Sequence, residues 1–180
     1  RRRCKRLDDD VRSALHLISV PQEILMLSVG TLAPSFSLPT APKKQLSLDE
    51  FRGRPVVLVF YPADWSPVCG DQLALYNELR SEFDRLGAAL LPISVDGVWC
   101  HAAFGTQRGY WFPLLADFEP KGRVARQFGV YDETSGMAKR ALFVIDGNGT
   151  IAWTHLSPDS VNPGADGILA ALEALPRSGS

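Results

Sequence analysis

Two continuous apolar runs stand out in the middle of the chain. Pro55 to Tyr61 and Ala88 to Val95 consist almost wholly of apolar residues. A short apolar run without polar alternation is typical of a strand that is buried on both faces of a sheet. Pro92 weakens this interpretation for the second run, because proline cannot donate a hydrogen bond to a neighbouring strand. We therefore expect two central strands, with a proline inside the second.

Helical spacing lies between these runs and after them. From Ser66 onward, apolar residues recur every three or four positions until Gly87, which predicts one helix between the two strands. Shorter helices are expected over about 98–108 and 120–128. The S-x-x-E sequence at 47–50 has the spacing of a capping box and predicts a single helical turn. Strand followed by helix, repeated, is typical of an α/β fold.

The last third of the chain predicts a hairpin and a final helix. Residues 140–146 and 151–154 are rich in strand formers and flank a Gly-Asn-Gly turn. Asn162 and Pro163 are typical of a helix start, as N-cap and first helical residue. Shorter extended pieces are expected at 36–38, 45–46 and 112–115. Parallel strands joined by helices, with an antiparallel hairpin at one edge, predict a mixed sheet that is flanked by helices on both faces.

Composition narrows the class of protein. The 180 residues suffice for one domain, and a formal net charge of -1 gives no general attraction to nucleic acid or to a membrane surface. Three cysteines are too few for a secreted disulfide framework, and the absence of a C-x-x-C pair argues against a zinc knuckle or a dithiol redox motif. We expect a cytoplasmic protein that uses isolated thiols.

The two ends differ from the rest. Residues 1–25 open with a basic cluster and turn acidic, which fits neither a secretory signal nor a transit peptide. We expect them to be an appended, non-native or disordered segment before a domain over 26–176, with native translation beginning at Met26. Cys4 then has no catalytic role. Residues 177–180 are expected to form a flexible tail.

The candidate nucleophile is Cys69. It falls in the first turn of the predicted helix, directly after a buried strand. A helix start offers unpaired N–H groups and a positive dipole end, which favour the reactive thiolate. Ser66 adds a hydroxyl one turn earlier, and Pro62 can shield the sulfur from bulk water. A lone cysteine near a helix start is more often a buried apolar residue, so the position alone does not decide its role.

The combination of residues is more specific than any one of them. Pro62, Ser66 and Cys69 stand in the order Pro-x-x-x-(Thr/Ser)-x-x-Cys, which resembles the peroxidatic motif of the peroxiredoxins, the alkyl hydroperoxide reductase and thiol-specific antioxidant family. Arg140, before an apolar strand, is similar to the family's active-site arginine. Ser66 stands where threonine is more common. The resemblance extends over about 26–175.

This resemblance implies a thioredoxin-like α/β fold and a thiol peroxidase. Cys69 would attack hydrogen peroxide or an organic hydroperoxide and become a sulfenic acid, while Arg140, Ser66 and backbone N–H groups stabilise the developing charge. No metal or other cofactor is implied. Thioredoxin, glutaredoxin or a low-molecular-weight thiol is the expected reductant, and a homodimer is the expected assembly.

Cys100 is the candidate resolving thiol. It follows the second apolar strand as Cys69 follows the first, so parallel neighbouring strands would bring both thiols to one edge of the sheet. Position 74, where some family members have a second cysteine, holds Ala74. The alternative is that Cys100 packs in the core and that an external thiol resolves. His101 could act as a base, but a Cys100–His101 zinc site lacks further ligands.

Two other functions compete with a peroxidase. A thiol–disulfide oxidoreductase is disfavoured by the missing C-x-x-C pair. A binding module or redox-stress chaperone on the same fold would tolerate the loss of Pro62, Ser66 or Arg140, yet all three are present. Replacing Cys69 separates the peroxidase from the binding module, because peroxide turnover should vanish in the first case and binding need not change in the second.

Overall fold

The computed structural model describes residues 25–176. The extension expected over 1–25, with Cys4, lies outside the described residues except for Leu25, as does the tail expected at 177–180. The elements are, in order, β1 (Ser37–Ala41), β2 (Lys44–Ser47), η1 (Leu48–Phe51), β3 (Val56–Phe60), α1 (Pro67–Glu78), α2 (Arg80–Arg85), β4 (Ala89–Ser94), α3 (Val98–Arg108), β5 (Leu115–Ala116), α4 (Arg123–Gln127), β6 (Tyr131–Asp132), β7 (Met137–Ala138), β8 (Arg140–Ile145), β9 (Ile151–Ser157) and α5 (Asp166–Glu173).

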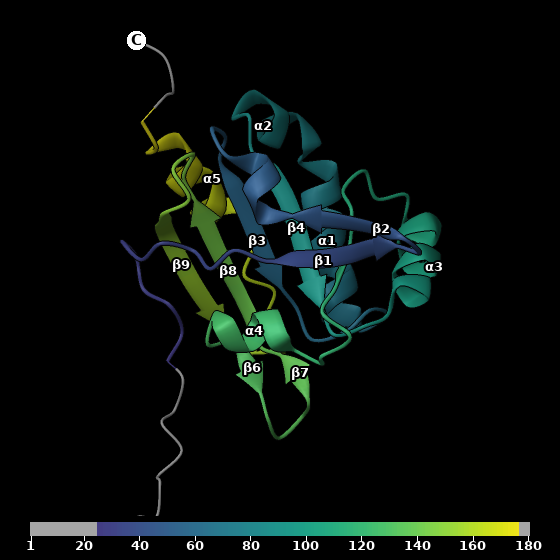
Figure 1. Cartoon of the computed structure of the whole chain (residues 1–180). Coiled ribbons are helices and arrows are strands. Elements are labelled where there is room, and N and C mark those ends of the chain that lie inside the picture. Colours follow the sequence, from purple (N-terminus) through teal and green to yellow (C-terminus); the bar gives the residue numbers. More distant parts are fainter. Residues whose placement is uncertain (1–24, 177–180) are drawn as a thin grey trace, which may run out of the picture.

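A five-stranded mixed sheet forms the centre, in the order β5-β4-β3-β8-β9 (Figure 1). β3 and β4 are parallel neighbours and every residue in them is buried, as the two apolar runs predict. β8 pairs antiparallel with both β3 and β9, which confirms the expected hairpin at one edge. The predicted α/β architecture with a mixed central sheet is therefore confirmed.

Each face of the sheet has its own core because side chains alternate along the strands. Val56, Leu58 and Phe60 of β3 face the N-terminal hairpin and α4. Val57 and Val59 face the opposite side, with buried residues of α1, α2, α3 and α5. Figure 1 shows the β1–β2 hairpin and α4 crossing one face while α1 and α5 lie behind the sheet. Cys69 belongs to the second core.

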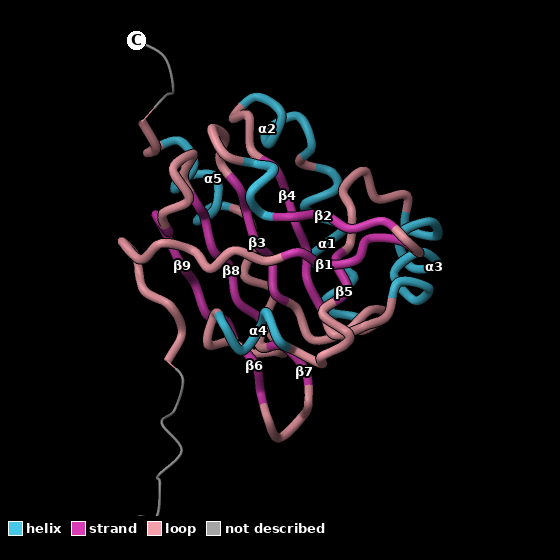
Figure 2. The backbone as a smooth tube through the Cα atoms, in the orientation of Figure 1, coloured by secondary structure: helices cyan, strands magenta, loops and turns pink. Residues whose placement is uncertain are grey.

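Pro92 is accommodated in β4 without a lost hydrogen bond to β3. The N–H of Ala89 donates to Pro55, and the carbonyl of Ile93 accepts from Tyr61, so odd-numbered residues of β4 face β3. The nitrogen of Pro92 therefore faces the other edge, where β5 pairs only with Ile93 and Ser94. Figure 2 shows β5 as a short strand near the end of β4. The missing donor falls beyond the end of the short β5 strand.

Several helix boundaries differ from the prediction. The helix expected from Ser66 to Gly87 divides at Leu79, whose backbone departs from helical geometry (φ −86°, ψ 17°), into α1 and α2. α4 begins only after Gly122, because a φ of 66° at that residue is incompatible with a helix that starts at Pro120. α3 has the predicted bounds.

The start of α5 was predicted wrongly. Ala165 is its N-cap, three residues after the expected Asn162. The side chain of Asn162 instead accepts from the N–H of Gly164, whose φ of 70° turns the chain before the helix. The small β6–β7 hairpin was not predicted, and the expected strand at 112–115 is only Leu115–Ala116.

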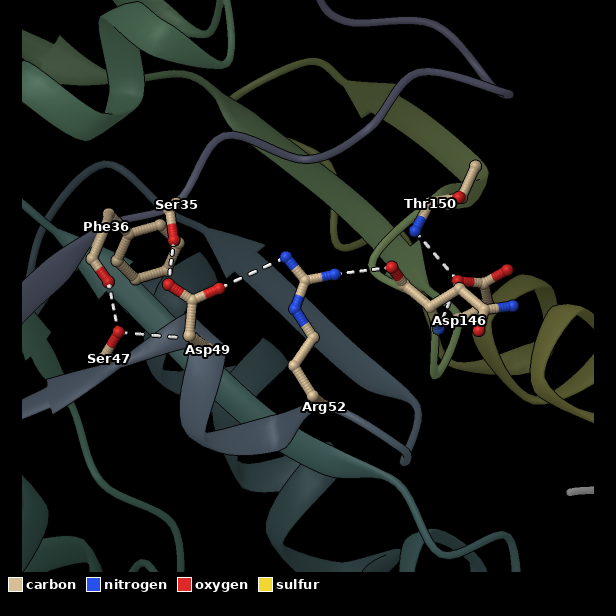
Figure 3. Close-up of polar contacts among 8 residues, drawn as sticks. Ser35, Phe36, Ser47, Asp49, Arg52, Asp146 and Thr150 are labelled. Carbon is tan, nitrogen blue, oxygen red and sulfur yellow. Dashed lines mark hydrogen bonds and ion pairs between the residues drawn. The ribbon is translucent and has the colours of Figure 1, made fainter.

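A polar network joins the helical turn η1 to the β8–β9 turn (Figure 3). Ser47 and Glu50 form the predicted capping box at the start of η1. Asp49 accepts from Ser35 and from Arg52, and Arg52 also donates to the carbonyl of Asn148. These contacts anchor the N-terminal segment at a distance from α1.

Within residues 25–176, no helix has the length and apolar character needed to cross a membrane.

Candidate active site

Cys69 lies in the first turn of α1, at the third helical position. Its side chain is fully buried. Ser66 is the N-cap and Pro67 is the first helical residue, which is a favoured place for proline because its missing N–H needs no partner there. The strand–loop–helix order puts the sulfur at the positive end of the helix, near backbone N–H groups that have no partner within α1.

Arg140 reaches the same sulfur from β8. Ala141 pairs with Phe60, so Arg140 lies where the loop to α1 leaves β3. Arg140 is 1% exposed, and its Nη2 lies 3.3 Å from Cys69 Sγ. Nε and Nη2 also donate to the carbonyl of Asp159, at 3.3 and 2.8 Å. A fixed positive charge in a buried site favours the thiolate over the thiol.

Gln72 completes the support of this arginine and was not predicted from the sequence. It follows Cys69 by three residues on α1, is fully buried, and accepts from Arg140 Nη1. Its Nε2 donates to the hydroxyl of Tyr76 (3.1 Å), and that hydroxyl donates to the carbonyl of Gly164 (3.0 Å). Burial raises the pKa of Tyr76 to about 12, so it remains a donor. In the sequence, the only sign of this role is that Gln72 lies three residues after Cys69, on the same face of the helix.

Pro62 and Ser66 lie in the loop that leads from β3 to Cys69. Pro62 is buried, and Ser66 is partly exposed. Within the described chain the Ser66 hydroxyl makes no capping bond to α1, although its carbonyl accepts from the N–H of Gly70 (2.8 Å). The hydroxyl is therefore available for another partner. The structure thus brings Cys69 and Arg140 into contact and places Pro62 and Ser66 in the adjoining loop.

The two serine N-caps, Ser66 of α1 and Ser47 of η1, should contribute differently to stability, because only Ser47 makes a side-chain capping bond. Ser66→Ala should change the free energy of unfolding by less than about 0.5 kcal/mol, because no side-chain cap bond is lost. Ser47→Ala is the matched control, since Ser47 forms a complete capping box and its removal should cost about 1 kcal/mol. Urea unfolding of both variants tests this, and an equal loss in both would contradict it.

Trp65 has a backbone conformation that is rare for its residue type. Its φ of 63° lies in the left-handed region, immediately before the N-cap of α1. The indole packs on Phe104 of α3, with ring centroids 5.0 Å apart. Left-handed geometry costs a residue with a Cβ about 1 kcal/mol, and such residues concentrate at functional sites. The packing on α3 holds this loop in a shape that it would not adopt alone.

Cys100 occupies the third position of α3, as Cys69 does of α1. β3 and β4 are parallel, so both helices begin at the same edge of the sheet, as expected. Both cysteines are free thiols, Cys69 buried and Cys100 partly exposed. The described chain therefore contains a second thiol at the edge of the sheet where the first one lies.

A polar cluster surrounds Cys100. Asp64, Asp96 and Cys100 each bring a potential ligand atom within 4.8 Å of the others. Tyr61 and His101 bond to the two oxygens of Asp64, at 2.7 and 2.9 Å. One oxygen of Asp96 accepts the N–H of Asp64 (2.8 Å). Three of the four carboxylate oxygens that a cation could use therefore already have hydrogen-bond donors.

Comparison with known proteins shows which family this chain resembles in sequence and in structure. The model of the AhpC/TSA family matches residues 29–154. Alkyl hydroperoxide reductase E of Mycobacterium tuberculosis is 37% identical over 132 residues, which cover 73% of this chain and 86% of the relative. Thioredoxin peroxidase of Echinococcus granulosus is 36% identical over 157 residues, which cover 82% and 80%. The crystal structure of peroxidoxin BcpB from Mycobacterium tuberculosis superposes with a TM-score of 0.76 at 33% identity, covering 84% of this chain and 99% of that one.

Proposed function

The chain belongs to the AhpC/TSA family and is a peroxiredoxin with a thioredoxin-like fold, and from this premise we propose that Cys69 is the peroxidatic thiol that reduces hydrogen peroxide and organic hydroperoxides. One observation carries this assignment. Arg140 Nη2 lies 3.3 Å from the sulfur of Cys69, and both side chains are almost completely buried. A cation beside a thiol and a position at a helix start both favour the thiolate, which is the nucleophilic form of cysteine.

The reaction follows from these groups. The thiolate of Cys69 attacks the terminal oxygen of the hydroperoxide, so an S–O bond forms while the O–O bond breaks. The leaving oxygen takes the electron pair and a proton and departs as water or an alcohol, which leaves Cys69 as a sulfenic acid. Arg140 and the N–H groups at the start of α1 stabilise the charge that develops on the two oxygens. The free hydroxyl of Ser66 can bond to the peroxide, and Pro62 restricts water.

Cys100 is the thiol that we assign to the second stage. It would attack the sulfenic acid of Cys69 and form a disulfide. The equivalent positions of the two thiols, each in the first turn of a helix at one sheet edge, support this assignment. Thioredoxin, glutaredoxin or a low-molecular-weight thiol in the cytoplasm would then reduce the disulfide. The name of the Echinococcus relative, thioredoxin peroxidase, makes thioredoxin the first reductant to test.

A homodimer is the assembly that we propose. Three exposed aromatic side chains lie around the start of α3: Trp99 (75% exposed), Phe118 (58%) and Trp65 (45%). Phe118 lies against Gly97, the N-cap of α3, and Trp65 packs on Phe104 of the same helix. A group of exposed aromatic side chains such as this one is typical of the centre of a protein interface. Sedimentation velocity of the full chain at micromolar concentration tests this, and a monomer would contradict it.

Peroxide consumption tests the proposed activity. The full-length protein with dithiothreitol should consume hydrogen peroxide and cumene hydroperoxide catalytically, with many turnovers per Cys69. A parallel assay should measure the reduction of a protein disulfide, which is the activity of the competing oxidoreductase class. Turnover in the second assay without turnover in the first would overturn the proposal.

A further inference from the structure

The loop between β9 and α5, residues 158–165, holds one edge of the Arg140 guanidinium. The carbonyl of Asp159 accepts from both Nε and Nη2 of Arg140, at 3.3 and 2.8 Å. Nη2 is also the nitrogen that lies 3.3 Å from the sulfur of Cys69. Gln72 accepts from the other terminal nitrogen, Nη1. The position of the Asp159 carbonyl therefore decides how Nη2 is directed toward the sulfur.

Ser157 supports the turn that contains this carbonyl. It is the last residue of β9, lies opposite Arg140 in the pairing of β8 with β9, and is 6% exposed. Its hydroxyl donates to the carbonyl of Val161 (3.0 Å), and the N–H of Val161 donates to the carbonyl of Pro158 (3.0 Å). These two hydrogen bonds close the turn from Pro158 to Val161, with Asp159 inside it.

Packing adds little to the rigidity of this turn. Residues 158–161 are all exposed, so their side chains do not anchor the turn in a core. Oδ1 of Asp159 accepts the backbone N–H of Arg140, but at a long distance of 3.4 Å. A segment with few buried contacts moves easily. The buried hydroxyl of Ser157 is therefore the main side-chain restraint on the turn among the residues described.

We propose that Ser157 is a positioning residue for peroxide reduction, because its hydroxyl holds the turn in which the Asp159 carbonyl directs Nη2 of Arg140 toward Cys69. This inference rests on the function proposed above for Cys69. Ser157 does not touch the reacting atoms and acts through the arginine. A donor stabilises the charge that develops on the peroxide only from the correct distance and angle. A turn that shifts would therefore slow the reaction even though Arg140 is still present.

Removal of the Ser157 hydroxyl should slow peroxide reduction. The second-order rate constant of Ser157→Ala should fall about tenfold, which is less than the roughly 10²-fold that a misplacement of about 1 Å can cost. Ser157→Thr keeps a hydroxyl that can donate, so it should recover at least about half of the wild-type rate constant. Stopped-flow measurement with hydrogen peroxide gives the constants of all three proteins. A Ser157→Ala protein as fast as the wild type would overturn the proposal.

Ser47→Ala is the matched control for lost stability. The hydroxyl of Ser47 also donates to a backbone carbonyl, that of Phe36 (3.2 Å), but it lies at the start of η1, whose Leu48 packs in the core on the other face of the sheet. Its removal should make unfolding easier and leave the rate constant for peroxide within about twofold of the wild type. Equal slowing in Ser47→Ala and Ser157→Ala would indicate a general loss of stability and contradict the positioning role.

A double-mutant cycle tests whether Ser157 acts through Arg140. In an Arg140→Met background, Ser157→Ala should change the rate constant by less than about twofold, because the group that Ser157 positions is gone. A merely structural role would instead slow the reaction by the same factor in both backgrounds. A further loss of about tenfold in the Arg140→Met background would therefore show that Ser157 does not act through the arginine.

The wild-type rate separates this inference from the function on which it rests. If the wild type shows no rapid reaction at Cys69, the proposed function fails and the positioning role fails with it. If the wild type and Ser157→Ala react equally fast, only the positioning role is wrong. Should Ser157→Ala not fold, Ser160→Gly tests the same turn from an exposed position, because glycine loosens the backbone. It should slow the reaction at least about threefold, and a wild-type rate in that variant would overturn the proposal.

Discussion

Cys69→Ser should lower the second-order rate constant for reduction of hydrogen peroxide by at least about 10⁴-fold, because a serine hydroxyl lacks the nucleophilic sulfur that attacks the peroxide. The substitution changes one atom in a fully buried site, so Arg140 and Gln72 should keep their contacts. Stopped-flow measurement of peroxide consumption with excess peroxide gives the constant directly.

Cys100→Ser is the control for this loss. It also removes a thiol, but from a partly exposed position that is not in contact with Arg140. The first reaction with one equivalent of peroxide should remain fast in this variant, even though no Cys69–Cys100 disulfide can follow. If Cys69→Ser still reduced peroxide fast, or if only Cys100→Ser lost the fast reaction, the assignment of the peroxidatic role to Cys69 would be wrong.

Arg140→Met should slow the same reaction by about 10²- to 10³-fold, the usual effect of removing one group that stabilises developing charge. The substitution removes the cation 3.3 Å from the sulfur, so the breaking O–O bond loses a donor. It also leaves the buried Gln72 Oε1 and the carbonyl of Asp159 without their donor. The free energy of unfolding should therefore fall by about 1–3 kcal/mol.

Two further variants separate charge from geometry. Arg140→Lys keeps the charge but lacks the planar fork that serves Cys69, Gln72 and Asp159 together, so its rate should lie between those of wild type and Arg140→Met. Arg54→Met is the matched control, since Arg54 is exposed and, among the residues described, its side chain donates only to the carbonyl of Gly87 and lies over the ring of Phe51. Stopped-flow rates and thermal unfolding should be measured on all three. An Arg140→Met enzyme as fast as wild type would show that the cation is not needed.

The central sheet could be predicted from sequence because its signal is local. The apolar runs of β3 and β4, and the Asn-Gly turn between β8 and β9, each depend on neighbouring residues only. The division at Leu79 and the late start of α5 were missed because they depend on how the helices pack and on the turn at Gly164. Local propensity is a weak guide where tertiary contacts decide.

The candidate site was predicted in part for the same reason. Cys69, Ser66 and Pro62 fall within one short segment, and Arg140 was added by the resemblance to the peroxiredoxins. The contact of Arg140 with Gln72 and the bond of His101 to Asp64 join residues 68 and 37 positions apart. No spacing rule links such pairs, so the residues that orient Arg140 and surround Cys100 became visible only in the fold.

Intact mass after one equivalent of hydrogen peroxide tests the central claim most directly. It should be measured on the wild type, Cys69→Ser and Cys100→Ser, with peptide mapping of the products. The wild type should lose two hydrogens through a Cys69–Cys100 disulfide, Cys100→Ser should gain one oxygen on Cys69, and Cys69→Ser should not react rapidly. A wild type that stops at one added oxygen on Cys69 would keep the peroxidatic role but assign resolution to an external thiol. Absence of rapid reaction at Cys69 in every protein would contradict the account.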